Sequence, residues 1–160
     1  MVNKGNNSYN GAIVLGLNDA IVESSGALVG LTFALAKSPL IATAGLITGI
    51  AAALSMASSE YLSAKEDNHK NPLKASIYTG IAYLLAVLIL VTPYFLIENT
   101  YFAGGIMFSL VILIIAIYTK YDSKIRKESF GKKFTEMLTI SLSVSIISFV
   151  VGILIRKLLV

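Results

Sequence analysis

Two acidic residues, Asp19 and Glu23, lie four positions apart inside a long apolar stretch. In a helix this spacing places both carboxylates on one face. A carboxylate near the centre of a bilayer costs about 2.5–3.5 kcal/mol, and such residues usually line a path for ions or protons. Two interpretations stay open: ion or proton handling, which we favour, and one protonated acid hydrogen-bonded between helices. Asn18 beside them could be a further oxygen ligand or an interhelical hydrogen-bonding group.

A second pair with the same spacing, Met56 and Glu60, follows in the next apolar stretch, among Ser55, Ser58 and Ser59. A methionine in a transmembrane helix most often only packs. A site of carboxylates with one thioether would suit a divalent transition metal of intermediate softness better than Mg²⁺ or Ca²⁺. No Lys or Arg lies in the interior of these stretches, so protons, cations or mutual burial must balance the acids.

Two polar segments lie between the apolar stretches. Residues 65–70 include Glu66, Asp67 and His69, the single histidine of the chain, and could catch a cation at the membrane surface. A solvated loop is the alternative, and we favour it. Residues 120–133 hold six basic residues and two acidic ones, Asp122 and Glu128. We expect this segment to lie on anionic headgroups.

The composition shows which elements must position these residues. Hydrophobic residues make up 56% of the 160 positions and charged residues 14%, and the mean hydropathy is +0.77. A soluble domain this apolar would lack the polar surface to cover its core, because ordinary domains are about 45–50% apolar and about 25% charged. We therefore predict an all-α integral membrane protein, with residues 1–160 forming one transmembrane domain. Its five spans are expected at 11–36, 39–63, 74–96, 101–118 and 134–155, each near the roughly 20 residues that a bilayer requires.

Basic residues are unequally divided between the two sides of such a protein. Ten would share the side of the N-terminus: Lys4, Lys65, Lys70, Lys74, Lys120, Lys124, Arg126, Lys127, Lys132 and Lys133. Three would lie on the other side: Lys37, Arg156 and Lys157. The positive-inside rule predicts a cytoplasmic N-terminus and an outside C-terminus. Six aromatic residues near the span ends would be interfacial: Tyr61, Tyr94, Tyr101, Tyr118, Tyr121 and Phe134.

Small residues at four-residue spacing would let helices approach closely. In the first span we expect the ridge at Gly26 and Gly30 to pack near the axis of a dimer. Gly45 and Gly49 begin a similar ridge in the second span. A fifth-span stripe of Ser141, Ser145, Ser148 and Gly152 is interpreted as structural packing.

Enzymatic chemistry has little support in the sequence. The chain has no cysteine, and its single histidine lies outside the spans. It contains no phosphate-binding glycine loop and no HExxH motif. An aspartyl protease dyad is normally brought together from different helices, whereas both first-span acids share one. We expect no enzyme, no permanently bound cofactor and no nucleic-acid partner.

Two motifs resemble the vacuolar iron transporter (VIT) family. Residues 16–31, GLNDAIVESSGALVGL, are similar to its first helix, and residues 55–63, SMASSEYLS, to its second. The resemblance implies a homodimer that exports Fe²⁺, often also Mn²⁺, from the cytosol in exchange for protons. It implies a pathway between the subunits, with Asp19 and Met56 at positions implicated in metal passage. Well-known eukaryotic members carry a cytoplasmic metal-binding insertion between the second and third helices. Only residues 64–72 lie at this place here, so the chain resembles a short form of the family.

We therefore expect a proton-coupled exporter of Fe²⁺ or Mn²⁺, in a prokaryotic plasma membrane or, in a eukaryote, a vacuole-type membrane. Its pathway would include Asp19, Glu23, Met56 and Glu60. Two alternatives stay open. One is a proton-coupled exporter of organic cations, which would prefer an aromatic-lined pocket. The other is a membrane docking partner for a separate iron-storage protein.

Overall fold

The computed structural model describes residues 7–159 and contains, over that range, five α-helices and no strand. The helices are α1 (Asn7–Leu35), α2 (Ser38–Glu66), α3 (Pro72–Leu96), α4 (Thr100–Arg126) and α5 (Phe130–Leu159). All five are long and apolar enough to cross a membrane. The predicted all-α class is confirmed, and the protein is an integral membrane protein. Lys4, which entered the charge count, lies outside the described residues, and the orientation of the termini stays a prediction.

Local sequence explains where three of the helices begin. Pro39 occupies the first turn of α2, where a missing backbone N–H breaks no helical hydrogen bond. Pro72 does the same in α3, and the Asn71 side chain accepts a hydrogen bond from the Lys74 backbone N–H at 3.3 Å. Asn99 caps α4 by accepting from the Phe102 N–H at 3.0 Å.

The connection between α4 and α5 is much shorter than predicted. The sequence indicated a loop from Thr119 to Lys133, whereas α4 continues to Arg126 and α5 begins at Phe130. Lys127 ends α4 in the left-handed conformation, with a φ of 56°. The helices extend beyond the apolar run because the added polar turns have partners: Asp122 is buried and accepts a hydrogen bond from the Lys133 ammonium.

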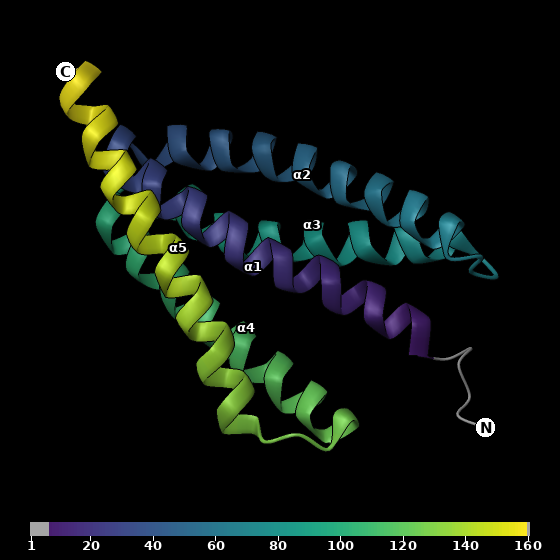
Figure 1. Ribbon diagram of the computed structural model, residues 1–160. Coiled ribbons are helices and arrows are strands. Elements are labelled where there is room, and N and C mark those ends of the chain that lie inside the picture. Colours follow the sequence, from purple (N-terminus) through teal and green to yellow (C-terminus); the bar gives the residue numbers. More distant parts are fainter. Residues whose placement is uncertain (1–6, 160) are drawn as a thin grey trace.

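Helix α1 lies at the centre of the fold and contacts all four other helices. In Figure 1, α1, α2 and α3 run side by side, and the α4–α5 hairpin crosses them at an angle. Core side chains include Ile21 and Leu28 of α1, Val87 of α3 and Met107 of α4. The exposed isoleucines and leucines of α5 would face lipid in the membrane.

The small-residue ridges have partners within the same chain. A side chain built on Gly26 would meet Val144 Cγ1 at 2.6 Å, and one built on Gly30 would meet the Ser148 carbonyl oxygen at 3.1 Å. The face that we expected at a dimer axis is therefore filled by α5. The interpretation of the α5 stripe as packing agrees with this contact, since Gly152 lies against Gly30.

One of the aromatic residues that we expected at the membrane interface, Tyr94, is instead buried in the protein. Tyr94 is 1% exposed, and its hydroxyl shares a hydrogen bond of 2.7 Å with Thr32 Oγ1 of α1. Tyr61, Tyr101 and Tyr121 are exposed near helix ends, as expected of interfacial aromatics.

Candidate functional site

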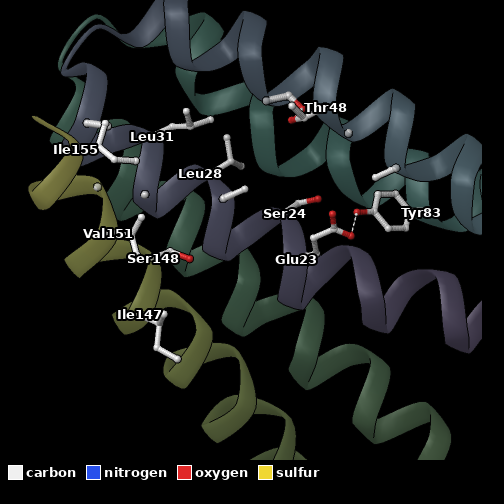
Figure 2. A pocket seen from close by; sticks show the side chains of 17 residues that line it. Glu23, Ser24, Leu28, Leu31, Thr48, Tyr83, Ile147, Ser148, Val151 and Ile155 are labelled. Atoms are coloured by element: carbon white, nitrogen blue, oxygen red, sulfur yellow. Dashed lines mark hydrogen bonds between the residues drawn. The ribbon is translucent and has the colours of Figure 1, made fainter. Parts of the chain in front are cut away.

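A groove of about 480 Å³ lies between α1, α2 and α5. Most of its lining is small or aliphatic, including Gly30, Gly49 and Gly152. Figure 2 shows Glu23, Ser24 and Tyr83 gathered at one end and Val151 and Ile155 at the other. The acid Glu23 thus lies with Ser24 and Tyr83 at one end of the groove, and Thr48 and Ser148 are further polar side chains of its lining.

Among the described residues, Glu23 has one hydrogen-bond partner, Tyr83. The Tyr83 hydroxyl donates a hydrogen bond to Glu23 Oε2 at 2.8 Å (Figure 2). Tyr83 comes from the middle of α3 and is fully buried, whereas Glu23 is exposed on the face of α1 that lines the groove. The acid therefore stands at the surface of the protein while its donor is fixed in the core.

Asp19 and Asn18 lie one turn before Glu23 on α1. Asp19 is half-buried, and no hydrogen bond or ion pair to it is found among the described residues. Its strongest charged neighbour is Glu23, which repels it. Asn18 Oδ1 is buried without a hydrogen-bond partner in the described part of the chain. The Asp19 carboxylate can therefore meet a proton or a cation, whereas Asn18 Oδ1 is enclosed by the protein.

Met56 and Glu60 lie on α2 and do not line this groove. Met56 packs against the edge of the core, and Glu60 is half-buried without an ion pair to any described residue. Within residues 7–159, no three His, Asp or Glu side chains gather closely enough to hold a metal ion. The predicted pathway residues are thus divided between α1 and α2 in a single chain.

The residues predicted as a cytoplasmic capture site lie where α2 ends. Glu66 is the last residue of α2, Asp67 caps it, and the His69 N–H donates to the Ala64 carbonyl. Glu66, Asp67 and His69 are all exposed, and they do not form a metal-binding cluster. This arrangement agrees with the solvated loop that we favoured from the sequence.

A second pocket, of about 390 Å³, lies between α1, α4 and α5. Its lining is strongly aromatic and includes Phe33, Tyr94, Tyr101, Phe108 and Phe149. No acidic residue lines it. The aromatic pocket and the acids of α1 are therefore separate features of the molecule.

Tyr83 is the residue of the site that sequence reasoning missed. A signal for it exists, because Tyr83 lies eleven residues into α3, far from either end of the helix. A tyrosine hydroxyl at that depth cannot reach the aqueous interface and needs a partner in the protein. The sequence could have indicated this need, but only the packing of α3 on α1 identifies Glu23 as the acceptor.

The fold and the site together define an integral membrane protein of five helices with two acids on its central helix and no basic partner for them among the described residues. The family model described as VIT family matches residues 10–70, which include most of α1, all of α2 and the start of the loop after it, so the resemblance is confirmed over that segment. A search of the curated proteins finds no match to the chain. Proteins of the VIT family are membrane transporters, which agrees with the expectation of no enzymatic activity.

Proposed function

We propose that the protein is a proton-coupled exporter of a divalent transition metal, Fe²⁺ or Mn²⁺, and that it works as a homodimer. The observation that carries this proposal is the pair Asp19 and Glu23 on the helix that contacts every other helix. An acid pair without a basic partner can bind a cation and, once the cation leaves, protons. Exchange of the metal cation for protons across the membrane is antiport.

The exposure of Glu23 supports a second copy of the chain. An acid on an outward face within the apolar span would meet hydrocarbon, which costs about 2.5–3.5 kcal/mol on insertion scales. The exposed hydroxyls of Thr48, Ser55, Ser58 and Ser59 on α2 extend this polar character. A partner subunit covering the groove would remove these groups from lipid and bring two copies of each acid together. Because α5 covers Gly26, we propose that the partner subunit contacts the groove side of α1 and α2.

Met56 and Glu60 are proposed to join the pathway in that dimer. They lie outside the groove of their own chain, so they would serve a site formed by two chains. Thioether and carboxylate ligands together favour Fe²⁺ or Mn²⁺ over Mg²⁺. The plasma membrane of a prokaryote remains the proposed location.

The aromatic pocket weighs against an organic-cation exporter. Such a transporter would place its acid beside aromatic rings, which attract organic cations. Here the aromatic pocket has no acidic lining residue, and the groove with Glu23 has a single aromatic one, Tyr83.

Flux through the purified chain in proteoliposomes tests the proposal. Mn²⁺ entry is followed with a dye inside the vesicles, and proton movement with a second, pH-sensitive dye. We expect Mn²⁺ entry coupled to opposite proton movement, with Mg²⁺ transported poorly. Tetraalkylammonium flux instead of Mn²⁺ flux would identify an organic-cation exporter. No flux of either cation, together with binding of an iron-storage protein, would support the docking alternative.

A further inference from the structure

We propose that Tyr83 is a positioning residue for Glu23: it holds one carboxylate oxygen against α3 and leaves the other for the transported cation. This inference rests on the proposed function. It concerns a residue outside the segment that matches the VIT family model, residues 10–70.

The hydrogen bond has the geometry of a fixed contact. The donor, Tyr83, is 0% exposed, so the surrounding core restricts its ring to one orientation. Its hydroxyl reaches Glu23 Oε2 at 2.8 Å, a normal length for an O–H···O hydrogen bond. No hydrogen bond to Glu23 Oε1 is found among the described residues, so this oxygen is available in the groove. A rigid donor therefore sets the direction of a flexible acid.

The two acids of α1 consequently differ. Asp19 has no hydrogen-bond donor among the described residues, whereas Glu23 has one from another helix. Groups that face Glu23 are Asp19 on α1 and Tyr83 on α3, and no described Lys, Arg or His pairs with it. Holding Glu23 in place reduces the entropy lost when a cation binds, because side-chain ordering is part of the cost of binding.

Tyr94 provides a matched comparison on the same helix. It is 1% exposed, and its hydroxyl also crosses from α3 to α1, where it meets Thr32 at 2.7 Å. Both tyrosines thus connect the same two helices from buried positions. Only the partner of Tyr83 is an acid on the groove, so a purely structural role predicts similar effects for the two hydroxyls, and a positioning role does not.

The test compares Tyr83→Phe, Tyr94→Phe, Glu23→Ala and the double variant Tyr83→Phe with Glu23→Ala. Each replaces a group without adding bulk, and Glu23 is exposed, so its truncation leaves no buried hole. For Mn²⁺ entry into proteoliposomes, we expect Tyr83→Phe to raise KM about three- to tenfold, as loss of one hydrogen bond would. Tyr94→Phe should leave KM unchanged. Tyr83→Phe should have no additional effect in the Glu23→Ala background, because its action requires the acid.

A second measurement is independent of transport. Dicyclohexylcarbodiimide, an apolar reagent, adds to carboxyl groups within membranes, and mass spectrometry locates the modified residue. We expect Glu23 to be labelled about threefold faster or more in Tyr83→Phe than in the wild type, and at the wild-type rate in Tyr94→Phe.

The outcomes separate the two proposals. Equal labelling of Glu23 in all three proteins, or equal KM values for Tyr83→Phe and Tyr94→Phe, would overturn the role of Tyr83. Absence of Mn²⁺ flux in the wild type would overturn the proposed function. The labelling experiment would still decide whether Tyr83 positions Glu23.

Discussion

Gly152 of α5 lies directly against the backbone carbonyl of Gly30 on α1, so closely that any side chain at Gly152 would collide with that carbonyl. The two helices meet backbone to backbone at this point. Close approach of this kind depends on residues without side chains, as in other membrane helix pairs. The contact joins the α4–α5 hairpin to the helix that carries both acids.

Gly152→Ala tests this contact. Because the obstructing atom is backbone, α5 must shift, and overpacking of this kind costs about 1–3 kcal/mol of the free energy of unfolding. Thermal unfolding in detergent measures the loss. Gly105→Ala is the control, since a side chain there meets nothing within 4 Å. Equal stability of the two variants would show that α1 and α5 do not pack in this way.

Asp19→Asn is expected to abolish exchange. The substitution keeps size and hydrogen bonding but removes the titratable charge that would alternately hold metal and proton. Insertion into the membrane should be unimpaired, because the cost of a carboxylate in the span is relieved. Metal-driven proton movement in vesicles should fall to background. A well-folded Asp19→Asn protein with normal exchange would leave Asp19 as a structural acid.

Glu23→Gln should weaken transport without abolishing it and should change its pH dependence. The reason is that Asp19, one helical turn away, would lose the charged neighbour with which it interacts. Initial rates of Mn²⁺ entry across a pH series measure the change. An unaltered pH profile at wild-type rates would remove Glu23 from the mechanism.

Lys133→Met should destabilise the α4–α5 hairpin. The Lys133 ammonium pairs with the buried carboxylate of Asp122, and it lies 3.1 Å from Glu128, which is more exposed. Loss of a charged partner of a buried acid costs about 1–3 kcal/mol, whereas the exposed pair adds little. Lys132→Met is the control, because Lys132 is exposed and forms no ion pair with a described residue. Thermal unfolding of both variants in detergent should separate them clearly.

The five helices could be predicted because each apolar run is close to or above the roughly 20 residues that a bilayer requires. Their ends could not all be predicted in the same way. Hydropathy falls at Tyr118, yet α4 continues to Arg126 because Asp122 finds a partner on α5. A contact between two helices determines where α4 ends, and the residue pattern along α4 alone does not reveal that contact.

Asp19 and Glu23 could be identified from the sequence because acids are rare in apolar spans. The partner of Glu23 could not be identified, since several hydroxyls were available and only the tertiary packing selects Tyr83. The glycines of α1 show the same limit. Their spacing predicted a close helix contact, but the spacing is equally suited to α5 or to a second chain, and the structure shows α5.

The hydrogen bond from Tyr83 to Glu23 joins a residue inside the segment that matches the family model to one beyond it. Residues 10–70 therefore do not contain all the residues that contact Glu23. A chimera that received this segment alone would inherit the acid, but a phenol at the position of Tyr83 would have to be supplied by the recipient. Exchange of helices between this chain and similar proteins should therefore treat α1 and α3 as one unit.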